Sequence, residues 1–215
     1  MLFFPKKAVS LHPISQGNMD KLSYALGLNF GQYLKQENIK AANYNDFAKG
    51  IETACESTQP LIPITEAQQL LNDYFKQLEA NKKAAAERTA KAGELFLTAN
   101  AKRPEVTTLP SGLQYEVLKN GNGTHPKTSD RVKVHYHGTL IDGTVFDSSV
   151  RRGEPATFGV TQVIQGWVEA LQLMSVGSKW KLYIPHNLAY GAHGSGNTIK
   201  PYSTLVFEVE LLDIV

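Results

Sequence analysis

Residues 132–138 read VKVHYHG and alternate strictly between apolar and polar side chains. Successive side chains of a β-strand point to opposite faces, so this period of two predicts a strand with Val132, Val134 and Tyr136 on one face. Residues 205–211, LVFEVEL, alternate in the same way near the C-terminus. Two half-buried strands of this kind are typical of an antiparallel sheet that covers a core on one face.

The chain around these strands divides into a helical half and a β-rich half. Beyond Pro104, β-branched and aromatic residues alternate with polar ones, and glycine-rich turns at 110–112 and 120–123 separate the segments. Residues 168–174 provide the only helical pattern in this half. The predicted fold class is therefore α+β, in which residues 104–215 form an antiparallel sheet wrapped on one short helix.

Residues 19–63 are expected to form an all-α domain. Apolar residues recur at helical spacing over 20–37, where Gly27 and Gly31 make a seam of small residues four positions apart. A glycine inside a helix costs about 1 kcal/mol relative to alanine. We therefore expect close packing against another helix to offset this cost.

Two further helices are predicted before the β-rich half. The first covers residues 44–56, with Asn43 or Asn45 as its N-cap. The second opens at Thr65, which stands three residues before Gln68 in the spacing of a capping box. Thr65 is accordingly the predicted N-cap of the second helix.

The second of these helices is predicted to continue as one long linker helix over residues 64–103. Its central stretch, 80–92, is rich in Ala, Lys and Glu and has almost nothing large to bury. We interpret it as a solvent-exposed helix that separates two domains and ends before Pro104. At 1.5 Å per residue it would extend roughly 50 Å.

Composition excludes several classes of function. The chain has 215 residues, of which 42% are hydrophobic, and its formal charge is only +2 without a long basic run, so a nucleic acid is not an expected partner. Cys55 is the only cysteine, which rules out an intramolecular disulfide and leaves its own role open. A secretory signal and a membrane span are not recognised. We expect a soluble cytoplasmic protein with no membrane partner.

The first residues of the chain have no sustained hydrophobic period. Residues 1–18 contain two prolines and a glycine, and Met19 directly precedes the first helical pattern. We expect residues 1–18 to be a disordered leader, and Met19 is a second candidate for the start of the protein.

Five motifs follow one another along the β-rich half. They are VHYHG at 134–138, DGTVFDSS at 142–149, VIQGW at 163–167, AYG at 189–191 and TLVFEVELL at 204–212. Their order and spacing resemble the FKBP family of peptidyl-prolyl cis–trans isomerases. The helical layout is similar to that of the bacterial branch with the macrophage infectivity potentiators, which implies a homodimer formed through residues 19–63.

The resemblance implies an apolar pocket that accepts a proline ring. Trp167 would be its floor, and Asp147 would stand at its rim near the twisting imide. The N–H of Ile164 and the hydroxyl of Tyr190 would hold carbonyl groups of the bound peptide. The other residues that the resemblance assigns to catalysis or substrate binding are Tyr136, Phe146, Ala156, Phe158, Val163, Ile199 and Phe207.

Such a pocket needs no covalent chemistry. Amide resonance opposes peptide rotation with a barrier of about 18–20 kcal/mol, and X–Pro bonds exchange over tens to hundreds of seconds. The twisted imide is less polar than the planar one, so a water-excluding aromatic pocket favours it. We expect no metal or cofactor, and the expected substrates are proline-containing unfolded or nascent polypeptides.

Other interpretations remain open at this point. Tyr136 and Tyr190 are compatible with ordinary buried tyrosines, and Asp147 is compatible with a turn cap. His135 and His137 share a strand face, but a metal site with two histidines and no third ligand is a weak hypothesis. The alternative function is a non-catalytic chaperone or adaptor that binds extended polypeptides.

The pocket rim departs from the family pattern. Residues 199–201 read IKP where many members have paired prolines, and Thr198 stands where an apolar residue is frequent. Ala156 replaces a frequent aromatic residue, which predicts a more open wall near Phe158. The resemblance also implies binding of macrolide inhibitors, and these changes leave its strength and the preference for the residue before proline open.

Overall fold

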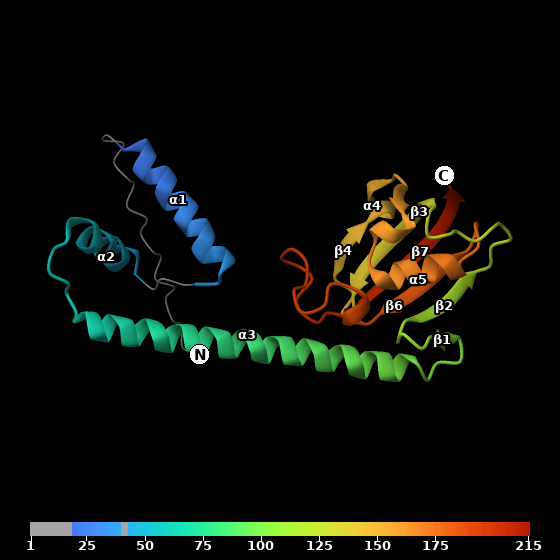
Figure 1. The fold of residues 1–215 in the computed structure, drawn as a ribbon, viewed down its shortest axis with the longest axis horizontal. Coiled ribbons are helices and arrows are strands. Elements are labelled where there is room, and N and C mark those ends of the chain that lie inside the picture. The colour runs from blue at the N-terminus through green and yellow to red at the C-terminus, as the bar shows by residue number, and fades with distance from the viewer. Residues whose placement is uncertain (1–18, 40–42) are drawn as a thin grey trace, which may run out of the picture. The chain divides into compact units, whose positions relative to one another are not determined.

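The computed structural model describes residues 19–39 and 43–215, so the expected leader over residues 1–18 lies outside the described part of the chain. The chain forms two compact units, Met1–Gln69 and Leu70–Val215, the first helical and the second containing a sheet (Figure 1). Their division falls inside the helix that the sequence suggested as a separate linker. No helix in the described residues is long and apolar enough to cross a membrane.

Within its described residues the first unit contains the starts of three helices: α1 (Lys21–Gln36), α2 (Tyr44–Glu56) and α3 (Ile64–Asn100). The first two match the predicted ranges. The side chains of Asp20 and Asn43 accept hydrogen bonds from first-turn N–H groups, as N-caps do, which decides between Asn43 and Asn45.

The apolar side of α1 is largely exposed within this unit. Phe30 stacks on Phe47 of α2 with 5.8 Å between ring centroids, but Leu26 is 63% exposed. A Cβ atom added to Gly27 or Gly31 would meet nothing within 4 Å. The close helix contact expected at these glycines is therefore not made among the described residues of the unit.

The predicted N-cap of α3 is wrong. The helix begins at Ile64, and Thr65 lies inside its first turn. The carbonyl oxygen of Pro63 accepts the N–H of Ala67 at 3.0 Å, so helical hydrogen bonding starts two residues earlier than a cap at Thr65 would allow. Pro63 is compatible with this place because its missing N–H costs nothing at a helix start.

The second unit is built on an antiparallel sheet of seven strands in the order β1-β2-β6-β7-β3-β4, with β5 paired to β3. The strands are β1 (Val106–Thr108), β2 (Gln114–Lys119), β3 (Arg131–Leu140), β4 (Val145–Ser148), β5 (Ala156–Gly159), β6 (Lys179–Ile184) and β7 (Leu205–Ile214). Val132, Val134 and Tyr136 are buried on β3, and Phe207 and Val209 are buried on β7. The predicted alternation of both strands is confirmed.

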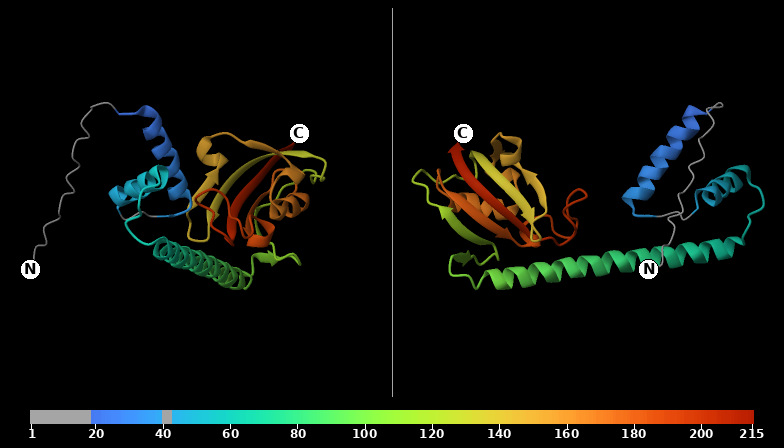
Figure 2. Two further views of the ribbon diagram at one scale, coloured as in Figure 1. Left: turned by 60° about the vertical axis from the view of Figure 1, so that its left-hand side comes forward. Right: turned by 180° about the vertical axis from the view of Figure 1, so that it is seen from behind.

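One face of the sheet is covered by α5 (Gln165–Leu173), as the views in Figure 2 show. A Cβ atom on Gly166 would lie 2.5 Å from Cγ2 of Ile184, so only glycine lets the helix approach β6 this closely. The predicted helix over 168–174 is placed too late, because its first hydrogen bonds run back to the carbonyl of Ile164.

This half also contains short helical segments that the sequence pattern does not predict. They are α4 (Ser149–Arg152) and two 3₁₀ turns, η1 (Val160–Gln162) and η2 (His186–Leu188). Each has only three or four residues, which is too short for a hydrophobic period to appear.

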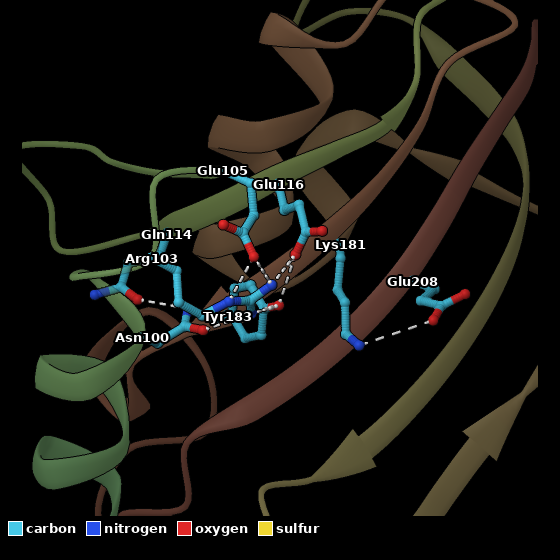
Figure 3. Close-up of polar contacts among 8 residues, drawn as sticks. All are labelled: Asn100, Arg103, Glu105, Gln114, Glu116, Lys181, Tyr183 and Glu208. Carbon is cyan, nitrogen blue, oxygen red and sulfur yellow. Dashed lines mark hydrogen bonds and ion pairs between the residues drawn. The ribbon is translucent and has the colours of Figure 1, made fainter.

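Residues 80–88 of α3 are largely exposed, as predicted for the linker helix, whereas the C-terminal part of α3 packs against the opposite face of the sheet. Gly93 and Asn100 are buried, and the rings of Phe96 and Tyr183 lie 6.0 Å apart. Tyr183 points away from the core because its neighbour Leu182 points into it. Polar contacts around Asn100 hold the end of the helix in place (Figure 3).

Candidate active site

A cavity of about 660 Å³ lies in the second unit. Every predicted site residue except Ala156 lines it. The lining residues are Tyr136, Phe146, Asp147, Phe158, Gln162, Val163, Ile164, Trp167, Tyr190, Ser195, Gly196, Asn197, Thr198, Ile199 and Phe207. They come from β3, β4, β5, β7, the start of α5 and the loop before β7, so the fold gathers segments that are far apart along the chain.

Trp167 stands at the centre of the aromatic lining and is only 4% exposed. Its ring meets Tyr136, Phe158 and Phe207 edge to face, with centroid separations of 5.5, 6.0 and 5.2 Å. Each such pair contributes about 0.5–1.5 kcal/mol beyond its buried area. The indole is therefore held firmly. Its Nε1 is buried and has no hydrogen-bond partner within the described part of the chain.

Ala156 does not line the cavity, contrary to the expectation from the resemblance. It opens β5 opposite Val134 of β3 and packs against the core. Phe158, two residues further on, points to the same side of the strand and does line the cavity. The longer side chain of Phe158 reaches the cavity, whereas the methyl group of Ala156 does not.

Asp147 is held at the cavity by two neighbouring side chains. The hydroxyl of Tyr136 donates to Oδ2 of Asp147 at 2.5 Å. Arg152 forms an ion pair with Asp147, donates to the Tyr136 hydroxyl at 2.8 Å and lies over the Tyr136 ring. Ser148, and not Asp147, caps the short helix α4 by accepting the N–H of Arg151. The polar triad Tyr136, Asp147 and Arg152 thus joins β3, β4 and α4.

The triad changes the acidity of its members. Partial burial raises the pKa of Asp147, but hydrogen bonds from Tyr136 and Arg152 outweigh it, and the net pKa is lowered. Burial, together with the hydrogen bond to Asp147, raises the pKa of Tyr136. Asp147 is therefore an anion and Tyr136 a neutral donor over a wide pH range.

Two further groups on the cavity lining can hold a peptide. The carbonyl of Ile164 accepts the N–H groups of Trp167 and Val168 at 2.9 and 3.1 Å, which starts α5. The N–H of Ile164 itself has no partner among the described residues. Tyr190 lines the cavity and is 39% exposed, so its hydroxyl can reach a bound molecule.

Several residues at this site were not predicted from the sequence. Arg152 follows Asp147 by five residues, a spacing that matches neither the strand nor the helix repeat and so gives no sequence signal. Gln162 lines the cavity, and its Oε1 accepts the N–H of Gly159 at 3.3 Å. Gly138 could have been noticed as a glycine inside a strand, which often marks a close approach. A Cβ atom there would lie 2.8 Å from ring atoms of both Phe146 and Phe207.

The two histidines of β3 face serine hydroxyls. Nδ1 of His135 lies 3.1 Å from Oγ of Ser149, and Nδ1 of His137 lies 2.9 Å from Oγ of Ser148. No group of three or more His, Cys, Asp or Glu residues in the described ranges could hold a metal ion. The third ligand that the metal hypothesis lacked is therefore not supplied by the described residues.

Two protein-family models match the chain. Residues 122–212 match the model described as FKBP-type peptidyl-prolyl cis-trans isomerase. Residues 19–117 match the model described as the domain amino-terminal to FKBP-type peptidyl-prolyl isomerase. The matches cover both halves of the chain and agree with the family that the five motifs suggested.

Individual relatives extend this similarity over nearly the whole length. The FKBP-type 22 kDa peptidyl-prolyl cis-trans isomerase of Escherichia coli (strain K12) is 47% identical over 90% of this chain and 94% of its own. The outer membrane protein MIP of Legionella longbeachae is 43% identical over 91% and 85%. The crystal structure of FkpA from Escherichia coli superposes with a TM-score of 0.67 at 37% identity, covering 93% of this chain and 97% of that one.

Proposed function

Since this chain belongs to the FKBP-type peptidyl-prolyl cis-trans isomerases, it accelerates rotation about X–Pro bonds, and we propose that the rotation takes place in the cavity around Trp167. The observation that carries the proposal is the aromatic lining. Trp167, Tyr136 and Phe207 meet edge to face and leave an apolar surface for a proline ring.

The physical reason is the change in polarity during rotation. A planar imide is polar because of its resonance, whereas the twisted transition state has lost that resonance. An apolar site therefore destabilises the ground state relative to the transition state, which lowers the barrier. This mechanism uses neither a nucleophile nor a general base.

The polar groups at the cavity orient the peptide. The N–H of Ile164 and the hydroxyl of Tyr190 donate to substrate carbonyl groups on either side of the proline. Asp147 lies at the rim, where its negative charge faces the carbonyl carbon of the twisting imide. Holding the peptide in one geometry reduces the entropy that must be lost on reaching the transition state.

The test is the refolding of a protein whose folding is limited by proline isomerisation. The chain is expected to accelerate the slow phase, and Tyr190→Phe is expected to reduce the acceleration severalfold. Tyr202→Phe is the matched control, because Tyr202 packs on His186 and does not line the cavity. Equal activity of the Tyr190→Phe variant and the wild type would place the reaction elsewhere.

The substrates that fit this site are proline-containing unfolded or nascent polypeptides. The cavity of about 660 Å³ accommodates more than a proline ring, which supports binding of the residues beside it. The same surface would bind macrolide inhibitors. A macrolide should therefore compete with a proline-containing peptide for the cavity.

We also propose that the first unit forms a homodimer. The N-terminal unit exposes large apolar side chains on α1 and α2, among them Leu22 at 68% and Ile51 at 49%. A groove along α1 is lined by Gly27, Leu28 and Gly31, with no atom within 4 Å of a Cβ added to either glycine. A second copy would bury these residues and use the close approach that two glycines permit.

Light scattering at several concentrations tests the dimer. Leu26→Asp, on α1, is expected to yield monomers that still isomerise short peptides. Leu118→Asp is the matched control, since Leu118 is an exposed leucine of the second unit. A monodisperse monomer of the wild-type chain would contradict the proposal.

A cytoplasmic location is proposed for this chain. The support is its composition: Cys55 is the only cysteine, and it is exposed and free. Cell fractionation with an antibody against the chain tests it. Recovery in a periplasmic or membrane fraction would contradict the proposal.

A further inference from the structure

The C-terminal part of α3 contacts the sheet along one helical face. Thr89 is half-buried, Gly93 is buried, Phe96 contacts Tyr183 and Asn100 is buried. These residues lie three or four positions apart, the spacing that places side chains on one side of a helix. The face carries small residues toward its N-terminal end, so the helix backbone approaches its neighbour closely there.

Gly93 lies against the side chain of Thr204. A Cβ atom built on Gly93 would lie 3.2 Å from Cβ of Thr204. Its distance to Oγ1 of Thr204 would be under 3.0 Å, which real Cβ atoms essentially never show. Thr204 is only 4% exposed and directly precedes β7. A side chain at position 93 would therefore have to rotate or shift the side chain of Thr204, or lift the helix from it.

Thr204 ends the loop that carries one side of the cavity, residues 191–204, which we call the cavity loop. The N–H of Tyr202 donates to the carbonyl of Gly191 at 2.8 Å and closes the base of the loop. Within it, Ser195 and Ile199 exchange N–H to carbonyl hydrogen bonds of 2.8 and 3.2 Å. Residues 195–199 all line the cavity.

A second set of contacts connects Ser203, the neighbour of Thr204, with this part of the loop. The hydroxyl of Ser203 donates to the carbonyl of Lys200 at 2.7 Å, and the N–H of Ser203 donates to the same carbonyl at 3.2 Å. Ile199, directly before Lys200, is 6% exposed and belongs to the core. The loop is thus a bonded hairpin, in which Ser203, the neighbour of Thr204, is hydrogen-bonded to Lys200, the neighbour of Ile199.

We propose that Gly93 is a positioning residue for the isomerase reaction. Through its contact with Thr204, it fixes the position of the cavity loop. The inference rests on the proposed location of the active site. It gives α3 a role in shaping the cavity: the helix supports the polar side of the cavity, which Ser195, Asn197 and Thr198 line. These residues would contact the amino acids next to proline, so this support should affect substrate preference.

The test compares Gly93→Ala, Thr204→Ala and the double variant in the full-length chain. Alanine favours a helix by about 1 kcal/mol over glycine, so Gly93→Ala does not weaken α3 by itself. We expect a severalfold lower kcat/KM for Gly93→Ala and a changed ratio of kcat/KM between peptides that differ in the residue before proline. In the double variant the clash with Oγ1 is removed, and both values should return toward those of Thr204→Ala.

Controls separate positioning from loss of folded protein. Glu94→Ala changes the exposed neighbour of Gly93 and should leave all values unchanged. A smaller fraction of folded enzyme would lower kcat/KM for every peptide by the same factor. A changed ratio between peptides therefore indicates a changed position of the cavity loop. If Gly93→Ala does not fold, Phe96→Leu loosens the same helix face without a clash and should shift the ratio.

Two results would overturn the inference. One is an unchanged ratio of kcat/KM between peptides in every folded variant of Gly93 or Phe96. The other is a loss of kcat/KM in Gly93→Ala that the double variant with Thr204→Ala does not restore. Tyr190→Phe distinguishes this from a failure of the proposed site. If Tyr190→Phe loses activity while the peptide ratio stays constant in the Gly93 variants, the proposed active site is supported and the positioning role of Gly93 is refuted.

Discussion

The hydroxyl of Tyr136 lies 2.5 Å from Oδ2 of Asp147, and Arg152 contacts both. Tyr136 belongs to β3 and Asp147 to the adjacent strand β4, so the bond ties two strands together at the edge of the cavity. Tyr136 and Arg152 each donate to a different carboxylate oxygen of Asp147. Asp147 consequently keeps one orientation at the rim.

Replacing Asp147 by asparagine is expected to lower kcat/KM about tenfold, which corresponds to roughly 1.4 kcal/mol of transition-state stabilisation. The amide is uncharged, so it loses the attraction of Arg152 and the strong hydrogen bond from Tyr136. A protease-free peptide isomerisation assay measures the effect. Asp142→Asn is the control, because Asp142 caps a turn outside the cavity through the N–H of Thr144. Equal losses in both variants would argue against a specific role for Asp147.

The activity should depend on pH only at the extremes. The pKa of Asp147 is lowered from its ordinary value of 3.8, so the stabilisation from its charge is present above that value and is lost as the pH falls through the lower folded-state pKa. The pKa of Tyr136 is raised from 10.0, so its contribution is present below that value and is lost as the pH rises through the higher folded-state pKa.

We therefore expect constant kcat/KM from about pH 5 to 9. A pH profile of the folded enzyme checks this, and Asp147→Asn should lack the acidic decline. A titration between pH 6 and 7 would contradict the assignment and would point to a histidine instead.

The two tryptophans should report ligand binding differently. Trp167 lines the cavity, whereas Trp180 stacks on Tyr115 with ring centroids 4.3 Å apart and lies outside the lining. In Trp180→Phe, where Trp167 remains, a proline-containing peptide should change the fluorescence emission. In Trp167→Phe the change should disappear. A response that survives in Trp167→Phe would locate the peptide elsewhere.

Asn100 should matter more for stability than other asparagines of α3. Its Nδ2 donates to Oε1 of Gln114 at 2.9 Å, and its Oδ1 accepts from Arg103 at 3.0 Å (Figure 3). Asn100→Ala leaves the buried amide of Gln114 short of a partner, which should cost about 1–3 kcal/mol in the free energy of unfolding. Urea unfolding measures it, with the exposed Asn81→Ala as the control. Equal midpoints for the two variants would refute the importance of this contact.

Much of the fold could be predicted because local backbone geometry sets the period of each element. The alternation over 132–138 and the helical spacing over 44–56 follow from the strand and helix repeat, and both are confirmed. The order of five motifs indicated the family and, through it, the residues around the cavity. Short elements such as α4 escaped because three or four residues are too few to reveal a period.

The sequence-based predictions were wrong where a local sequence pattern competed with a contact made by a neighbouring residue. Thr65 has the right type and spacing for a cap, but Pro63 provides an earlier acceptor carbonyl and the helix begins before Thr65. Ala156 lies on the correct side of β5, yet its side chain is too short to reach the cavity.

The sequence by itself determined the class of each segment and the family of the protein, because those depend on side-chain periods and on motif order. Only the tertiary structure decided that Arg152 completes the triad with Tyr136 and Asp147, and that Gly93 of α3 lies against Thr204. Arg152 reaches Tyr136 on a different element, and Gly93 and Thr204 lie far apart along the chain. Both contacts follow from close packing and have no repeat along the chain by which they could be recognised in advance.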